Sequence, residues 1–217
     1  VLDSLGIRPD LVVGTSMGAI IGGMYASGYT GREIDSLARS LSLNDLFRQY
    51  EPRTPHSLGD RLPLVVWEQG EGSFTLQRAA VREAEVNGLI NAAMLRGNLR
   101  ARGSFDSLPI PFRAVATDLS GREEVILRGG DLARAVRASM SIPLVFEPER
   151  MDGRYLGDGA LVANIPVEVA RREGAAQVIV SDATEHLADT VNLNSPIVLA
   201  EQLLGFLFNQ PPATLDS

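Results

Sequence analysis

Residues 11–28 read LVVGTSMGAIIGGMYASG, and this stretch indicates a strand, a sharp turn and a helix in direct succession. The run LVV at residues 11–13 is short, apolar and mostly β-branched, which is typical of a buried strand. A helical pattern follows from Met17 to Ser27, and Gly28 is a suitable residue to end it. A strand that passes directly into a helix favours an α/β fold.

The rest of the chain continues this alternation of strands and helices. Thr30 and Glu33 have the spacing of a capping box, which predicts a helix to about residue 41, and Asp131 can cap a helix that runs to Met140. We expect further strands at 64–67, 112–117, 124–127, 151–156 and 177–180, and further helices at 86–94, 166–173 and 196–208. This pattern predicts one α/β domain, a three-layer sandwich with a mostly parallel central sheet covered on both faces.

Composition excludes several classes of protein. The chain has 217 residues, of which 45% are apolar, so it can bury a sizeable core. Its 27 acidic and 20 basic residues give a net charge of −7, which argues against a nucleic-acid partner. The absence of cysteine excludes disulfide scaffolds, thiolate metal sites and thiol catalysis.

The sequence GTSMG, residues 14–18, has the pattern of a nucleophile elbow in the strand–turn–helix context that this motif requires. Gly14 and Gly18 flank Ser16 and lack the Cβ atoms that would clash in a sharp turn. The hydroxyl of Ser16 would then sit at the positive end of the following helix. The backbone amide of Met17 is a candidate oxyanion donor. Ser16 is therefore the candidate nucleophile.

A serine hydroxyl needs a base, and the residues alone leave two candidates. Asp158 stands in a tight Asp-Gly turn, followed by Gly159 and Ala160, although such turns are common without function. His186 would complete a Ser16, Asp158 and His186 triad in the chain order of α/β-hydrolases. The other histidine, His56, precedes every candidate acid.

Taken together, the motifs resemble the patatin-like phospholipase family over nearly the whole chain. GTSMG and DGA, residues 158–160, carry the resemblance, and they are supported by PDLVV at 9–13, PFRAVATD at 111–118, AVRASMSIP at 135–143 and DGALVANIPV at 158–167. The resemblance implies a patatin-type fold and a catalytic dyad in which Ser16 is the nucleophile and Asp158 the general base. It also implies phospholipase A or lysophospholipase activity at a membrane surface, without a metal or other cofactor. An aspartate with an ordinary pKa of about 3.9 would be a weak base for this task.

The family's glycine-rich oxyanion loop has no match in residues 1–13. We therefore expect residues 1–217 to form a single catalytic domain from which an N-terminal strand and this loop are missing. Two alternatives stay open: a general carboxylesterase that uses the triad with His186, and an impaired domain that binds a lipid or a partner without turnover.

The C-terminal segment resembles bacterial family members that are joined to an outer-membrane β-barrel. Asn194-Ser195-Pro196 precedes an apolar helix, which could pack into the core, form a homodimer seam or lie on lipid. The resemblance favours a bacterial protein of the cell envelope or a secreted one over a cytoplasmic one.

Overall fold

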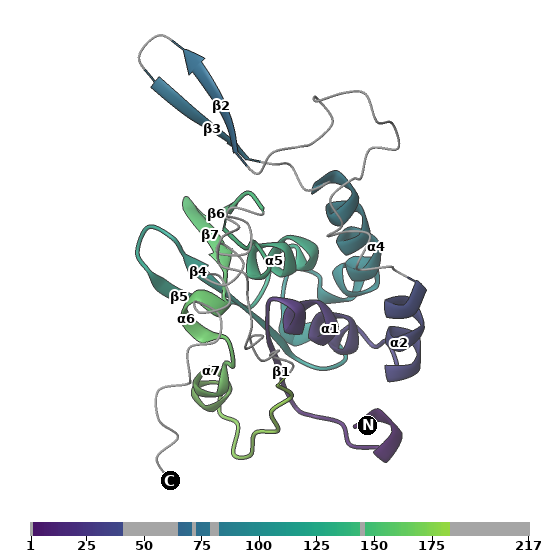
Figure 1. Ribbon diagram of the computed structural model, residues 1–217. Helices are drawn as coiled ribbons and strands as arrows, with labels where there is room; N and C mark the ends of the chain where they lie inside the picture. The colour runs from purple at the N-terminus through teal and green to yellow at the C-terminus, as the bar shows by residue number, and fades with distance from the viewer. Residues whose placement is uncertain (1, 41–64, 71–72, 79–82, 144–145, 183–217) are drawn as a thin grey trace, which may run out of the picture.

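A computed structural model describes residues 2–40, 65–70, 73–78, 83–143 and 146–182 (Figure 1). Its elements, in chain order, are η1 (Asp3–Leu5), β1 (Val12–Thr15), α1 (Met17–Ala26), α2 (Gly31–Ser40), β2 (Val65–Gly70), β3 (Ser73–Arg78), α4 (Glu83–Ala101), η2 (Phe105–Ser107), β4 (Phe112–Asp118), β5 (Glu123–Leu127), α5 (Leu132–Ser139), β6 (Glu149–Met151), β7 (Arg154–Asp158), α6 (Ala160–Ala163) and α7 (Val167–Arg172). None of the described helices combines the length and apolar character that crossing a bilayer requires.

Strand β4 lies at the centre of the main sheet and pairs along both of its edges. β1 runs parallel to the first half of β4 and ends with Thr15 opposite Val115. β7 runs antiparallel to the second half and ends with Asp158 opposite Ala116. β5 pairs with β4 residues that also face β1 or β7, so it must occupy the opposite edge. β1 and β7 therefore share one edge, and their carboxyl ends meet there.

The α/β class expected from the sequence is confirmed, and the sheet is mixed. β1 and β4 are parallel, whereas the other described pairings of this sheet, β4–β5, β4–β7 and β6–β7, are antiparallel. β4–β5 and β6–β7 are hairpins closed by short turns, which only antiparallel strands can use. β2 and β3 form a separate antiparallel hairpin. The parallel part of the sheet that the structure describes is thus the β1–β4 pair.

Helices α1, α4 and α5 pack against one another beside the sheet (Figure 1). Their apolar faces enclose the main core together with η2 and β4, and Met94, Phe105, Phe112 and Val136 are fully buried there. α6 packs against β4 and β5, and α7 packs against β1. All seven residues of β4 are buried, so both faces of the central strand are covered. This burial is what a layered α/β domain requires.

Local signals in the sequence placed several helix ends correctly. The capping box of α2 is present, because the Thr30 N–H donates to Glu33 Oε2 at 2.7 Å and the Glu33 N–H donates to Thr30 Oγ1 at 3.2 Å. Asp131 Oδ1 accepts a hydrogen bond of 3.0 Å from the Arg134 N–H at the start of α5. α4 includes the helix expected at 86–94 and extends beyond it at both ends.

One expected element is wrong: residues 177–180 do not form a buried strand. The segment is irregular, and Ile179 is 68% exposed. A short apolar run becomes a strand only where a neighbouring strand accepts its hydrogen bonds, and no described strand pairs with this one. The helix expected at 196–208 lies outside the described residues, as do His56 and His186.

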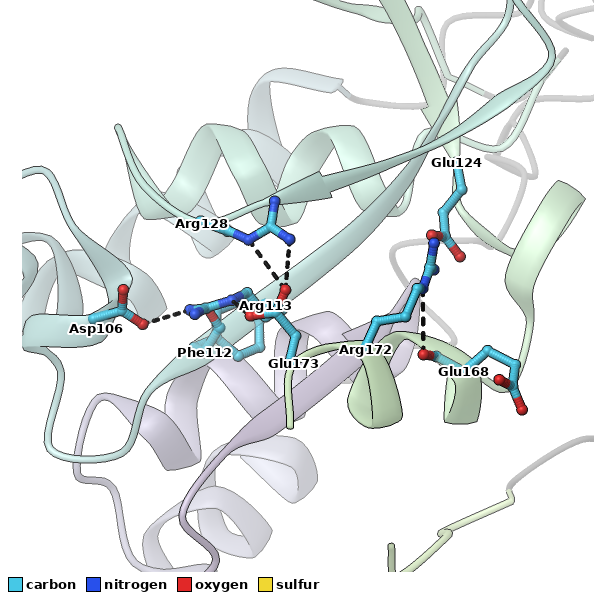
Figure 2. Close-up of polar contacts among 8 residues, drawn as sticks. All are labelled: Asp106, Phe112, Arg113, Glu124, Arg128, Glu168, Arg172 and Glu173. Carbon is cyan, nitrogen blue, oxygen red and sulfur yellow. Dashed lines mark hydrogen bonds and ion pairs between the residues drawn. The ribbon is translucent and has the colours of Figure 1, made fainter. Parts of the chain in front are cut away.

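An ion-pair network connects the end of α7 to the sheet (Figure 2), and its two central side chains, Arg113 and Glu173, are nearly buried. Arg113 Nε donates to Glu173 Oε2 at 2.6 Å, and Arg113 Nη1 contacts Asp106 Oδ1 at 2.7 Å. Arg128, just after β5, binds the other oxygen of Glu173. The hydrogen bonds from Arg128 and Arg113 hold the pKa of Glu173 below its ordinary value despite the opposing effect of burial. The network therefore anchors the segment that leads away from Asp158.

Candidate active site

Ser16 occupies a strained turn between β1 and α1. Its φ of 52° and ψ of −120° are unusual for a residue with a side chain. A Cβ on Gly14 would lie 2.3 Å from the carbonyl oxygen of Gly18, so Gly14 has to be glycine for the chain to turn this sharply. A Cβ on Gly18 would meet nothing within 4 Å. The steric role expected for both glycines therefore applies to Gly14 alone, and Gly18 contributes its backbone.

Ser16 and Asp158 are in direct contact. The Ser16 hydroxyl donates to Asp158 Oδ2 at 2.7 Å. Sheet topology explains this contact, because β1 ends immediately before Ser16 and β7 ends at Asp158, and the two ends meet on one edge of β4. Ser16 is half-buried, so reagents can reach it, whereas Asp158 is completely buried behind it. The Ser16 hydroxyl is thus partly accessible, and the Asp158 carboxylate contacts it from the interior of the protein.

The surroundings of Asp158 fix its carboxylate and alter its pKa. Asp158 Oδ1 accepts a hydrogen bond of 2.8 Å from the Ala160 N–H, and Thr117 Oγ1 donates to the Asp158 carbonyl at 2.8 Å. Burial raises the pKa of Asp158 to about 6, although the hydrogen bonds from Ala160 and Ser16 oppose the rise. Asp158 is therefore a stronger base than a solvated aspartate, whose ordinary pKa is about 3.9.

Gly159 allows the turn after Asp158 to approach the sheet. A Cβ on this residue would lie 2.1 Å from the Val115 carbonyl oxygen. The chain then enters α6, and the Thr15 hydroxyl donates to the Ala163 carbonyl at 2.9 Å. The strand before Ser16 is thereby tied to the helix after Asp158.

Met17 is the first residue of α1 and follows Ser16 directly. The N–H groups of a first helical turn have no acceptor within their own helix, so they are available to an anion. The Met17 amide is accordingly in a suitable place for an oxyanion donor. The Met17 side chain is 41% exposed beside the candidate nucleophile.

Sequence reasoning assigned no role to Ser139 or Thr117, although both contact the dyad. Ser139 Oγ accepts a hydrogen bond from the Ser16 N–H, and Thr117 donates to the Asp158 backbone. Both residues lie in motifs that carried the family resemblance, but their contacts depend on tertiary structure. Across the described ranges, His, Asp and Glu side chains form no group of three that could hold a metal ion.

Comparisons with known proteins match most of the chain. A model of the patatin-like phospholipase family matches residues 1–171. An uncharacterized NTE family protein of Mycobacterium tuberculosis is 30% identical over 156 residues, which cover 72% of this chain and 36% of that protein. The uncharacterized protein YqhO of Bacillus subtilis is 31% identical over 196 residues, covering 82% of this chain and 62% of the relative. Patatin-like phospholipase domain-containing protein 6 of Homo sapiens is 26% identical over 183 residues, covering 83% of this chain and 12% of the human protein. The chain thus spans less than two thirds of the length of each of these relatives.

Proposed function

This chain belongs to the patatin-like phospholipase family, and from that premise we propose that it hydrolyses acyl esters of lipids through a Ser16–Asp158 dyad. The observation that carries the proposal is the hydrogen bond of 2.7 Å from the Ser16 hydroxyl to a buried carboxylate, at a strained strand-to-helix turn. A serine hydroxyl within hydrogen-bond distance of a base is an arrangement that activates the serine as a nucleophile.

In the proposed reaction, Ser16 Oγ attacks the ester carbonyl while Asp158 takes the hydroxyl proton. The negative charge that develops on the carbonyl oxygen is stabilised by the Met17 amide at the start of α1. Collapse of the tetrahedral intermediate breaks the ester bond, and Asp158 gives its proton to the leaving alcohol. Water then attacks the acyl-enzyme and gives a proton to Asp158, which returns it to Ser16 as the fatty acid leaves.

The proposed substrates are phospholipids or lysophospholipids presented at a membrane surface. Apolar side chains are exposed on the two helices that follow the dyad residues: Met17 and Ile21 on α1, and Val162 on α6, each 40–42% exposed. Met17 and Ile21 are four residues apart, so they lie on the same side of α1. Apolar groups beside the nucleophile suit an acyl chain better than a polar soluble ester.

Vesicles of phosphatidylcholine and the soluble ester p-nitrophenyl butyrate together test this proposal. The wild-type chain should release fatty acid from the vesicles and nitrophenol from the ester, and Ser16→Ala should do neither. A fluorophosphonate probe should label the wild type at Ser16 and leave Ser16→Ala unlabelled. Turnover of the ester without any release from vesicles would favour a general esterase, and labelling of the alanine variant would refute the assignment of Ser16.

A His186→Ala variant separates the dyad from a triad. The dyad requires activity close to that of the wild type, whereas loss of activity in a folded His186→Ala protein would favour the triad. A wild-type chain that binds vesicles and hydrolyses neither substrate would support the binding domain instead.

A further inference from the structure

Ser139, the last residue of α5, is completely buried between the elbow and the sheet. Its hydroxyl donates to the Val115 carbonyl at 2.6 Å and accepts a hydrogen bond of 3.0 Å from the Ser16 N–H. A hydroxyl has one proton and two lone pairs, so both bonds can form together. The bond to β4 fixes the direction of the hydroxyl, and the remaining lone pair holds the backbone of Ser16.

Residues 139–141, at the end of α5, also bind the backbone of Asp158 and Gly159. The Ser139 carbonyl accepts a hydrogen bond of 3.1 Å from the Gly159 N–H, and the Ser141 carbonyl accepts one of 2.9 Å from the Asp158 N–H. Residues 139–141 therefore contact the backbone on both sides of the Ser16–Asp158 pair. These contacts do not involve the hydrogen bond between the two side chains.

We infer that Ser139 is a positioning residue, which holds Ser16 in its strained conformation at hydrogen-bond distance from the Asp158 carboxylate. The inference rests on the proposed function. A positive φ at a residue with a side chain persists only where its surroundings impose it, and the Ser139 hydroxyl is the side-chain group that binds the Ser16 N–H. Without this hydroxyl, Ser16 can relax and its Oγ can leave the carboxylate.

The chain offers a matched control at Ser141, two residues away in the same turn. Ser141 is 1% exposed, and its hydroxyl accepts from Arg137 Nη1 and donates to the Arg137 carbonyl. Replacing either serine with alanine removes one buried hydroxyl. Only Ser139→Ala removes a hydroxyl bound to Ser16.

The test compares Ser139→Ala with Ser141→Ala in the full chain, using p-nitrophenyl butyrate. Because displacement of a reacting group by about 1 Å can cost about 100-fold in rate, we expect Ser139→Ala to lower kcat by about 10- to 100-fold with little change in KM. Ser141→Ala keeps the backbone carbonyl that binds the Asp158 N–H, so its loss of kcat should be clearly smaller than that of Ser139→Ala. Ser139→Cys keeps a weak donor and acceptor and should recover part of the loss; it also serves as the test variant if Ser139→Ala fails to fold.

A second readout does not depend on turnover. Titration of the Asp158 carboxyl by ¹³C NMR should show a higher pKa in Ser139→Ala than in Ser141→Ala, because the hydrogen bond from Ser16 lowers that pKa. The value should move toward that of Ser16→Ala. An active wild type with equal kcat and equal pKa in the two variants would overturn the role of Ser139 and leave the proposed function intact. An inactive wild type would refute the proposed function, and the pKa comparison would still decide the role of Ser139.

Discussion

Replacing Asp158 with asparagine should stabilise the fold while it abolishes hydrolysis. The carboxylate is completely buried, and the groups that bind it are the Ala160 N–H and the Ser16 hydroxyl. Asparagine has nearly the same shape, and its oxygen can keep the bond from Ala160. Its amide carries no charge, so it avoids the cost of burying a carboxylate at neutral pH. It also cannot accept the serine proton, which removes the proposed base.

The expected gain in stability follows from the raised pKa of Asp158. Burial raises the pKa of Asp158 from 3.8 to about 6, and about two pKa units at 1.36 kcal/mol each correspond to about 3 kcal/mol. Between these two pKa values the folded protein binds more protons at Asp158 than the unfolded chain does. The favourable contribution of protonated Asp158 is therefore complete below about pH 3.8 and is lost as pH rises through about 6. Asparagine does not ionise, so the stability of Asp158→Asn does not fall in this way as pH rises.

Thermal and urea unfolding at several pH values provide the assay. At pH 7, the free energy of unfolding of Asp158→Asn should exceed that of the wild type by up to about 3 kcal/mol. This corresponds to a Tm about 6–12 °C higher for a chain of this size. The difference should shrink as pH falls toward 4. Asp152→Asn makes the same substitution at an exposed turn and should change stability by less than about 0.5 kcal/mol. A less stable Asp158→Asn protein at pH 7, or a difference that does not vary with pH, would refute this account of the site.

Three further predictions concern activity and packing. Hydrolysis should fall as pH drops through about 6, because protonated Asp158 cannot act as a base; a pH–kcat profile that is flat from 7 to 4 would contradict this. Gly14→Ala forces a Cβ against the Gly18 carbonyl and should destabilise the fold by about 1–3 kcal/mol, whereas Gly18→Ala enters open space and should unfold like the wild type in urea. Glu173→Gln removes the charge that joins two arginines (Figure 2) and should cost about 1.5–3 kcal/mol in urea unfolding. Glu168→Gln, at an exposed ion pair, should cost less than about 1 kcal/mol, and equal losses in these two glutamine variants would contradict the buried role of Glu173.

Features that depend on neighbouring residues in the chain could be predicted from the sequence. The capping box at Thr30 and Glu33 and the cap at Asp131 involve side chains within three residues of the groups they bind. The turn at Ser16 follows from an apolar strand, a glycine and a helical pattern in immediate succession. The juxtaposition of Ser16 and Asp158 was expected from the family resemblance, because no local pattern connects residues so far apart in the chain.

Features that depend on distant parts of the chain could not be predicted. The run at 177–180 has the composition of a strand, but strand formation also requires a partner that the pattern does not identify. The role of Ser139 depends on the meeting of α5, β4 and the elbow. The raised pKa of Asp158 depends on complete burial, which results from packing around the end of β7.

Burial of Asp158 also bears on how two side chains could suffice for the proposed chemistry. A carboxylate with an ordinary pKa takes a proton from a serine hydroxyl only at great cost, because the hydroxyl is a far weaker acid. Raising the pKa to about 6 reduces that cost by about 3 kcal/mol, or about 100-fold in rate if the proton is fully transferred in the transition state. The same 3 kcal/mol is the stability that Asp158→Asn should regain. In the proposed mechanism, therefore, the end-to-end meeting of β1 and β7 supplies both the contact between the dyad residues and the dry site that strengthens the base. In the proposed mechanism a histidine is not needed to bring the pKa of the base toward neutral, because burial raises the pKa of Asp158 to about 6.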